Sequence, residues 1–110
     1  MVLRVDDQVV GTFNVTNTVS NYSVQVNVIR GVSHRIDVVY TNDISRHRQN
    51  RNLTIQTLQV NTTSIRPTDQ SVVYDRGTGN AAFDGRNVGP GLNTMPVNGA
   101  LRFTVPAAAF

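Results

Sequence analysis

Val38-Val39-Tyr40-Thr41-Asn42-Asp43 and Arg51-Asn52-Leu53-Thr54-Ile55 are the two stretches that decide the fold of this chain. Each joins an apolar run to one end of the polar loop 41–52, which reads TNDISRHRQNRN. Two strands that present a loop dense in amides, arginines and one carboxylate are the usual arrangement of a binding site on a rigid sheet. We therefore expect the rest of the chain to act as a scaffold for this loop, with a second polar loop around Asp84.

The composition predicts a single all-β domain. A chain of 110 residues with 39% hydrophobic content is large enough for one core. It contains no Lys and no Glu, which are good helix formers, and it is rich in Val, Thr and Asn, which favour strands and polar turns. We predict a β-sandwich of jelly-roll type over residues 1–105, with residues 106–110 as a tail or the start of a linker.

Alternating apolar residues locate the expected strands. Residues 2–5 and 8–15 read as a hairpin, because Asp6-Asp7 supplies a turn between them. Residues 22–28 alternate strictly, with Tyr22, Val24, Val26 and Val28 on one face, which predicts a strand with one buried face. Further strands are expected around Ile36–Tyr40, Leu53–Val60, Ile65, Val72–Tyr74 and Leu101–Val105.

Two irregular regions interrupt this pattern. The apolar spacing slips between Ile55 and Leu58, which predicts a β-bulge. From Asp75 to Asn98 the sequence is rich in Gly, Asn, Asp and Pro. A connection of this length inside a small domain is more often functional than idle, so it is a second candidate binding region.

The charge pattern argues against nucleic acid and membrane as partners. The formal net charge is +3, and all basic residues other than histidine are Arg. This excess is modest and spread along the chain, and no helix suited to a DNA groove is expected. No apolar run is long enough to span a bilayer, and Met1 leads straight into a strand-like run without a signal peptide. The absence of Cys excludes disulfides, thiolate metal sites and a cysteine nucleophile.

The central loop carries the oxygen donors of a possible calcium site. Asn42, Asp43, Asn50 and Asn52 bracket it, and calcium prefers carboxylate and amide oxygens. Asp43 is the only carboxylate among them, and the spacing is not that of an EF-hand. The alternative is that these side chains only cap turns.

The same loop carries a basic cluster of Arg46, His47, Arg48 and Arg51. Such groups contact carboxylates or sulfates on acidic sugars, although a solvated basic loop is the alternative. Aromatic platforms for sugar rings are scarce, because the chain has no Trp. Tyr74 and Phe83 flank the Gly-rich region and are the candidates, with ordinary core packing as the alternative.

The sequence does not favour an enzyme. A glycosidase needs two carboxylic acids across a cleft, and the adjacent Asp6 and Asp7 would point to opposite sides of a strand. No Gly-x-Ser-x-Gly nucleophile elbow is present. A zinc site would have to combine His34 and His47, far apart in sequence, with a carboxylate such as Asp37.

Four segments together resemble a known family. They are LRVDDQVV at 3–10, TND at 41–43, RNLTI at 51–55 and NGALRF at 98–103. In this order they resemble the calcium-dependent xylan-binding carbohydrate-binding modules, families thirty-six and sixty. The Asn-Asp and Arg-Asn-Leu pairing is the more specific part, and the resemblance covers nearly the whole chain.

The resemblance implies a non-catalytic jelly roll in which protein groups and paired sugar hydroxyls share one calcium ion. The Asp of the family's Asn-Asp pair falls on Asp43, and its second Asp falls on Asn50, which removes one charge from the site. The family's Gly-Gly-Glu opening segment would precede Met1. Its disulfide and its Trp near the final strand are missing, and the corresponding region reads Asn93–Val97.

We therefore predict a non-catalytic, calcium-dependent β-glycan-binding module, accessory to the catalytic module of a secreted, extracellular polysaccharide-active protein. The alternatives are a structural or adhesive module without calcium or glycan, and an Arg-mediated binder of acidic polysaccharide. The predicted calcium ligands are Asp43 and Asn50, with Asn42 and Asn52 assisting. The predicted carbohydrate contacts are Arg51, His47, Tyr74, Phe83 and Asp84.

Overall fold

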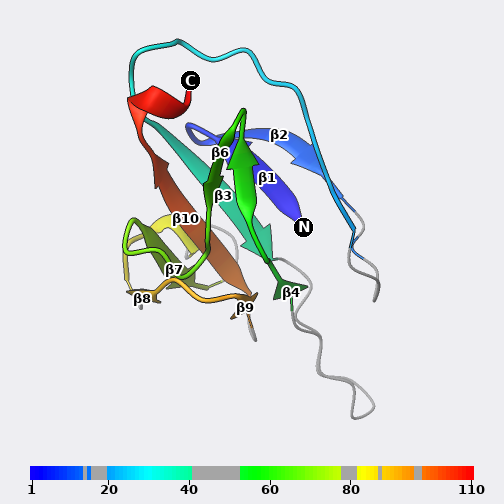
Figure 1. Cartoon of the computed structure of the whole chain (residues 1–110). Coiled ribbons are helices and arrows are strands. Elements are labelled where there is room, and N and C mark those ends of the chain that lie inside the picture. Colours follow the sequence, from blue (N-terminus) through cyan, green and yellow to red (C-terminus); the bar gives the residue numbers. More distant parts are fainter. Residues whose placement is uncertain (14, 16–19, 41–52, 78–81, 87, 96–97) are drawn as a thin grey trace.

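The computed structural model describes residues 1–13, 15, 20–40, 53–77, 82–86, 88–95 and 98–110. In these ranges the chain is nearly all β, which confirms the predicted fold class (Figure 1). Its strands are β1 (Val2–Val5), β2 (Gln8–Thr12), β3 (His34–Tyr40), β4 (Leu53–Thr54), β5 (Leu58–Val60), β6 (Thr63–Ile65), β7 (Val72–Arg76), β8 (Val88–Pro90), β9 (Thr94–Met95) and β10 (Gly99–Val105). A short 3-10 helix, η2 (Ala107–Ala109), follows β10.

One antiparallel six-stranded sheet is the main layer, in the order β2-β1-β3-β10-β7-β8. β3 and β10 lie at its centre and pair along seven residues each. The predicted hairpin is confirmed, since Asp6 and Asp7 take positive φ angles of 49° and 70° between β1 and β2. Two positive φ values in succession match a tight hairpin turn that fits the twist of the strands.

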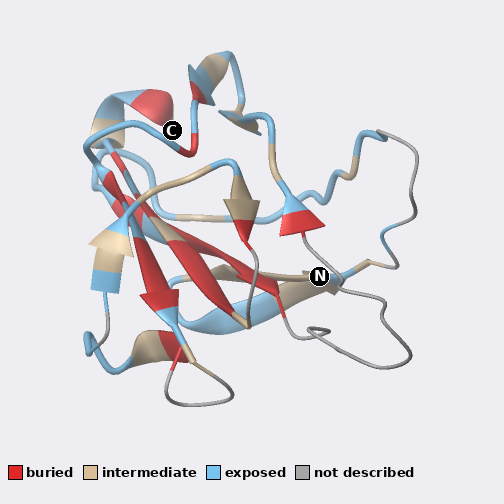
Figure 2. Cartoon of the chain, turned by 90° about the horizontal axis from the view of Figure 1, so that it is seen from below, coloured by how far each residue is buried: buried red, intermediate tan, exposed pale blue. Residues whose placement is uncertain are grey.

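The core lies on the inner face of this sheet, and Figure 2 shows that burial concentrates in the central strands. Alternate residues of β3, β10 and β7 point inward: Ile36, Val38, Tyr40, Leu101, Phe103, Val105, Val72 and Tyr74. Leu101 and Phe103 are both 0% exposed. The period-two pattern of the sequence therefore located the buried face of these strands correctly.

A second layer of short pieces covers the inner face. It contains the hairpin β5–β6, the pair β4–β9 and the extended segment 20–29. This layer contributes three buried side chains to the core, those of Leu53, Ile65 and Met95. Residues 106–110, predicted as a tail, pack here as well: Ala109 is buried, and its carbonyl accepts a hydrogen bond of 2.8 Å from Asn61 Nδ2.

Two predictions in the second layer were wrong. Residues 22–28 do not form a strand: in the described structure they run extended and belong to no sheet (Figure 1). The slip between Ile55 and Leu58 is not a bulge within one strand, because the chain changes partner there. β4 pairs with β9, whereas β5 pairs with β6. Among the described strands, the register of β1 against β2 shifts between Leu3 and Arg4.

Candidate functional site

The sheet brings its candidate binding loops to one end. β3 and β7 both run antiparallel to β10, so the last residues of β3 and β7 meet the first residue of β10. Gly99 pairs with Tyr40 on one side and with Arg76 on the other. Loop 41–52 begins after Tyr40, and the turn-rich region begins after Arg76. Two regions whose starting residues, Tyr40 and Arg76, are 36 positions apart in sequence therefore begin side by side.

Rigid attachments surround this end of the sheet. Tyr40 and Leu53, which flank loop 41–52, are 6% and 4% exposed. Gly77 N donates to the carbonyl of Asn98 at 2.9 Å and so ties the end of β7 to the start of β10. Gly99 must lack a side chain, because a Cβ there would lie 2.6 Å from the carbonyl oxygen of Asp75. A loop anchored on buried strand ends in this way is suited to hold ligand groups in place.

The predicted calcium ligands Asn42, Asp43, Asn50 and Asn52 lie outside the described residues, as do His47 and Arg51. Elsewhere, the described part of the chain contains no group of three or more His, Cys, Asp or Glu residues that would hold a metal ion. The donor set of the loop fits calcium by its chemistry, since a carboxylate and amide oxygens are hard ligands. The loop therefore remains the candidate metal centre.

Three of the predicted sugar contacts lie among the described residues, and their surroundings differ. Tyr74 is 3% exposed and packs in the core, which is the packing alternative that its sequence context left open. Asp84 is exposed, and its Oδ1 accepts a hydrogen bond of 2.8 Å from the backbone N–H of Arg86. Phe83 lies on the outer face of the sheet, where arginine side chains cover its ring.

Arg4 and Arg102 both lie over the ring of Phe83. Their guanidinium carbons are 3.8 Å and 5.5 Å from the ring centroid, within the range of a cation–π contact. Arg102 Nη1 also donates to the carbonyl of Phe83 at 3.4 Å. Phe83 is thus held by contacts within the protein, with two arginines against its ring.

Below Phe83, Arg102 lies between two buried carboxylates on the outer sheet face. Arg102 Nε donates to Asp37 Oδ1 at 3.2 Å, and its Nη1 lies 3.9 Å from Asp75 Oδ2. Asp37 and Asp75 are both 0% exposed. Burial raises the pKa of the Asp37 carboxyl above its usual value, and the Arg102 charge opposes this shift. The only sign of this cluster in the sequence is that Asp37 and Arg102 each alternate with apolar residues.

The cluster attaches the loop that follows β7 to the sheet. Gly85 N donates to Asp75 Oδ2 at 2.9 Å, and Ala82 is buried against Val39 and Ala100. One oxygen of each carboxylate, Asp37 Oδ2 and Asp75 Oδ1, has no hydrogen-bond partner in the described structure. Arg102 is the cation that pairs with both carboxylates, while Arg4 pairs with Asp7, so we assign the cluster a role in fixing loop 82–86.

A small cavity of about 280 Å³ lies beside Phe83 on the same outer face. Its lining is mainly apolar and includes Val2, Val39 and Ala82 beside the charged Arg4 and Asp7. It reaches the end of the sheet that carries loop 41–52, where Tyr40, Gly77 and Asn98 also line it. A hydroxyl-rich sugar ring gains little from such walls, because its polar groups would lose water without finding partners. The polar loops that leave this end of the sheet are therefore better candidates for sugar contacts than the apolar walls of the cavity.

Among the described residues, no helix is long and apolar enough to cross a membrane. Comparisons with curated proteins and with solved structures found no match. A family model does match residues 1–75, and its description reads "Ca-dependent carbohydrate-binding module xylan-binding". The match contains β1, β2, β3, the whole of loop 41–52, β4, β5, β6 and most of β7, whereas β8, β9 and β10 lie beyond it. It covers well over half of the chain, so the protein belongs to this carbohydrate-binding module family, family 60.

Proposed function

We propose that this protein binds xylan or a similar β-glycan, without catalysis, at the end of the sheet from which loop 41–52 and the turn-rich region 76–96 depart. The observation that carries the proposal is the family match, which spans loop 41–52 together with both of its buried anchors, Tyr40 and Leu53. The pairing of Gly99 with Tyr40 and Arg76 supports it, because this brings the two loop regions to one edge.

We further propose that the binding depends on calcium. Asp43 and Asn50 would be the central ligands, and Asn42 and Asn52 would assist them. A calcium ion held there offers open coordination positions to paired sugar hydroxyls. The protein's own part is to supply the oxygen donors and to hold the ends of the loop on β3 and β4. A single carboxylate makes this a site of low charge, so we expect modest calcium affinity.

Direct contacts to the sugar would come from Arg51, His47 and Asp84. Arg51 and His47 stand in the same loop as the calcium ligands, and Asp84 is exposed on the neighbouring loop. Tyr74 and Phe83 are not part of this set, because the core holds Tyr74 and arginines hold Phe83. Such an arrangement recognises hydroxyl pairs and needs no aromatic platform.

The proposal includes a biological setting. Members of a non-catalytic binding family act as accessories, so we propose that this module accompanies a catalytic module in a secreted protein and holds it on polysaccharide. Attachment of this kind raises the local concentration of substrate for the linked catalytic module.

The test compares two variants that remove the same charge, Asp43→Asn and Asp69→Asn. Asp69 is exposed, and its Oδ1 accepts from Ser71 N and Oγ, bonds that an Asn oxygen can retain. In affinity electrophoresis through xylan gels with calcium, Asp43→Asn should lose the retardation and Asp69→Asn should keep it. Equal retardation of both variants would contradict a role for Asp43.

The dependence of retardation on ionic strength distinguishes calcium-dependent binding from binding through arginine side chains. Arg46, Arg48 and Arg51 would bind an acidic polysaccharide with a steep dependence on ionic strength. A calcium site predicts loss of retardation in chelator and little response to salt. Retardation that survives chelator and disappears in high salt would favour the arginine alternative, and none under any condition would favour a structural module.

A further inference from the structure

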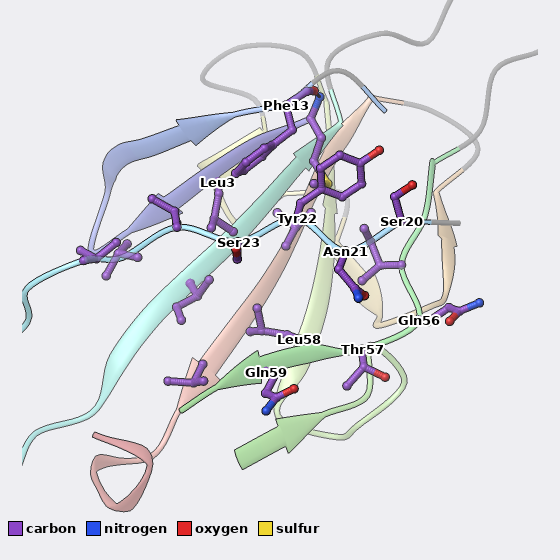
Figure 3. A pocket seen from close by; sticks show the side chains of 18 of the residues that line it. Leu3, Phe13, Ser20, Asn21, Tyr22, Ser23, Gln56, Thr57, Leu58 and Gln59 are labelled. Carbon is purple, nitrogen blue, oxygen red and sulfur yellow. Dashed lines mark hydrogen bonds between the residues drawn. The ribbon is translucent and has the colours of Figure 1, made fainter. Parts of the chain in front are cut away.

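Segment 20–29 lies over the inner face of the sheet, and contacts near both of its ends attach it there. Near its start, the ring of Tyr22 packs against that of Phe13, with 5.4 Å between the ring centroids (Figure 3). At its end, the carbonyl of Ile29 accepts a hydrogen bond of 2.6 Å from Nε2 of His34, the first residue of β3. This second contact depends on a side chain that titrates near neutral pH.

His34 is held between two hydrogen-bond acceptors. Its Nε2 faces the carbonyl of Ile29, and its Nδ1 lies 2.5 Å from Oδ2 of Asp6 in the turn between β1 and β2. The residue is only 7% exposed, and the ring of Phe110 packs edge-on against the imidazole at 4.5 Å. Only the imidazolium carries a hydrogen on both nitrogens, so only the protonated side chain can donate to both acceptors.

Asp6 is the partner that keeps its hydrogen bond when the imidazole is neutral. Its carboxylate is fixed, because Oδ1 accepts from the backbone N–H of Arg35 at 3.1 Å, and the backbone N–H of Asp6 donates to the Arg35 carbonyl at 2.9 Å. The hydrogen bond from His34 lowers the pKa of Asp6, so this group is ionised at neutral pH. A carboxylate is a stronger acceptor than a peptide carbonyl, so the single N–H of the neutral ring stays at Nδ1. Nε2 and the carbonyl oxygen of Ile29 then face each other as two acceptors without a donor.

Asp6 is the charged side chain in direct contact with the ring. Asp7, from the same turn, lies 3.5 Å from Arg4 Nη2 and 4.0 Å from Arg35 Nη1. Arg30, which follows Ile29, is exposed. β10 and the residues after it approach the ring with side chains that carry no charge, those of Val105 and Phe110. The contact with Ile29 therefore depends on the proton of His34 itself.

We propose that His34 attaches the end of segment 20–29 to the sheet only while its imidazole is protonated. Loss of the proton detaches Ile29, while the packing of Tyr22 on Phe13 keeps the start of the segment in place. The hydrogen bonds to Ile29 and Asp6 raise the pKa of His34 above 6.5. The segment is therefore attached at mildly acidic pH, and it is released as pH rises through this raised value.

The release changes the space between the two layers. A cavity of about 1230 Å³ lies there, and residues of segment 20–29 line it together with Val5 and Ile36 of the sheet and Leu58 of β5. Val26 and Val28 belong to the part of this lining that moves when Ile29 detaches. Protonation of His34 thus controls how far apolar side chains of the inner face are covered.

This inference is independent of the proposed function. His34 begins β3, whereas loop 41–52 leaves from the other end of this strand, after Tyr40. A failure of glycan binding would not affect the proton dependence of the segment.

The first test is NMR relaxation of the isotope-labelled wild-type protein from mildly acidic to mildly alkaline pH. The backbone order parameters of residues 24–29 should fall from about 0.85 to below about 0.6, with the same midpoint as the titration of His34. Those of β3 and β10 should stay near about 0.85, because the long ladder does not depend on this proton. Order parameters of residues 24–29 that stay unchanged through the titration would overturn the proposal.

Asp6→Asn and Asp7→Asn are matched variants. Both remove one carboxylate from the same turn, and both positions have a positive φ angle, which Asn tolerates. In Asp6→Asn, the amide nitrogen replaces Oδ2 and donates to Nδ1, so the neutral ring carries its hydrogen on Nε2 and donates to Ile29. This variant should keep residues 24–29 ordered at alkaline pH, whereas Asp7→Asn should release them as wild type does. Equal release in both variants would overturn the proposal.

A measurement on wild type alone stands if Asp6→Asn fails to fold. The chemical shifts of the ring nitrogens report which of them carries a hydrogen, and the His34 signals are those missing from His34→Gln. We expect hydrogen on both nitrogens at acidic pH and on Nδ1 alone at alkaline pH. A neutral ring with its hydrogen on Nε2 would overturn the proposal, because that form keeps Ile29 attached.

Discussion

The two layers of this protein differ in how they are held together. In the six-stranded sheet, β3 and β10 pair along seven residues, and the inward side chains Leu101 and Phe103 are 0% exposed. In the second layer the paired elements are two or three residues long, and the segment 20–29 belongs to no sheet in the described structure. Long ladders and full burial make one layer a scaffold, whereas the other layer is held by short ladders.

This difference concerns packing more than the proposed binding site. Both layers hold loop 41–52, because Tyr40 ends β3 in the sheet and Leu53 begins β4 in the second layer. The long ladders and the fully buried side chains, in contrast, lie in the sheet. Substitutions of the same type in the two layers should therefore have different consequences for stability, which is a direct way to test the comparison.

The largest expected effect is that of Leu101→Ala in β10. Leu101 is 0% exposed at the centre of the core, so its truncation should lower the free energy of unfolding by about 3–5 kcal/mol. Chemical denaturation monitored by circular dichroism measures the change. A loss below about 1 kcal/mol would contradict a tightly packed inner face.

Arg102→Ala should cause the next largest loss of stability. The substitution leaves Asp37 and Asp75 buried without their cation, which costs about 3 kcal/mol near neutral pH. The deficit should shrink as pH falls, because a carboxyl whose pKa is raised in the folded state binds its proton preferentially there. Parallel denaturation of wild type and variant at neutral and acidic pH gives this difference, and a pH-independent deficit would contradict it.

Leu58→Ala in β5 is the matched counterpart of Leu101→Ala. Leu58 is only partly buried and borders the cavity, so the same truncation should cost about 1 kcal/mol in the second layer. The ratio of the two losses is the informative quantity. Equal losses would show that the second layer is packed as tightly as the sheet and would remove the basis of the comparison.

The smallest expected effect concerns His34, which connects the two layers. Its Nδ1 lies 2.5 Å from Asp6 Oδ2 and its Nε2 lies 2.6 Å from the carbonyl of Ile29. Both partners accept hydrogen bonds, so both ring nitrogens must donate and the imidazolium is the favoured form. The hydrogen bonds to Ile29 and to Asp6 raise the pKa of His34 above 6.5.

The sign of the pH dependence follows from this shift. A histidine with a raised pKa in the folded state stabilises the fold fully below its ordinary value of 6.5, and this contribution is lost as pH rises through the folded pKa. Wild type should therefore exceed His34→Gln in melting temperature most at mildly acidic pH, and the gap should narrow above neutrality. A gap that widens with rising pH would contradict the assignment.

The sequence predicted the sheet better than the second layer. In β3 and β10, alternation identified the buried residues correctly. A strand that is paired on both sides in a long ladder can bury its apolar side chains only on one face of the sheet. The family was also recognised correctly, from Asn42-Asp43 and Arg51-Asn52-Leu53. For residues 22–28 the same alternation predicted a strand wrongly, because a strand also needs a neighbour, and the pattern of one segment does not report whether a neighbour exists.

For the candidate site, loop 41–52 is a prediction from the sequence. The cluster of Arg102 with Asp37 and Asp75, which holds the neighbouring loop 82–86, was not predicted. Arg102, Asp37, Asp75 and Phe83 come from four distant positions, and only the register of β3, β10 and β7 brings the charged groups together. Phe83 was expected to stack on sugar because it flanks the Gly-rich region. Sequence reasoning had no means to foresee that Arg4 would cover its ring.

The most direct test of the central claim is isothermal titration of the wild-type protein with soluble xylan, first in millimolar calcium, then in chelator, then with calcium restored. We predict saturable binding in calcium, loss in chelator and full recovery. Thermal melts of the same samples without xylan should show calcium raising the stability by about 1.4 kcal/mol when its concentration is about tenfold above Kd. Xylan binding of equal affinity in calcium and in chelator would contradict the account.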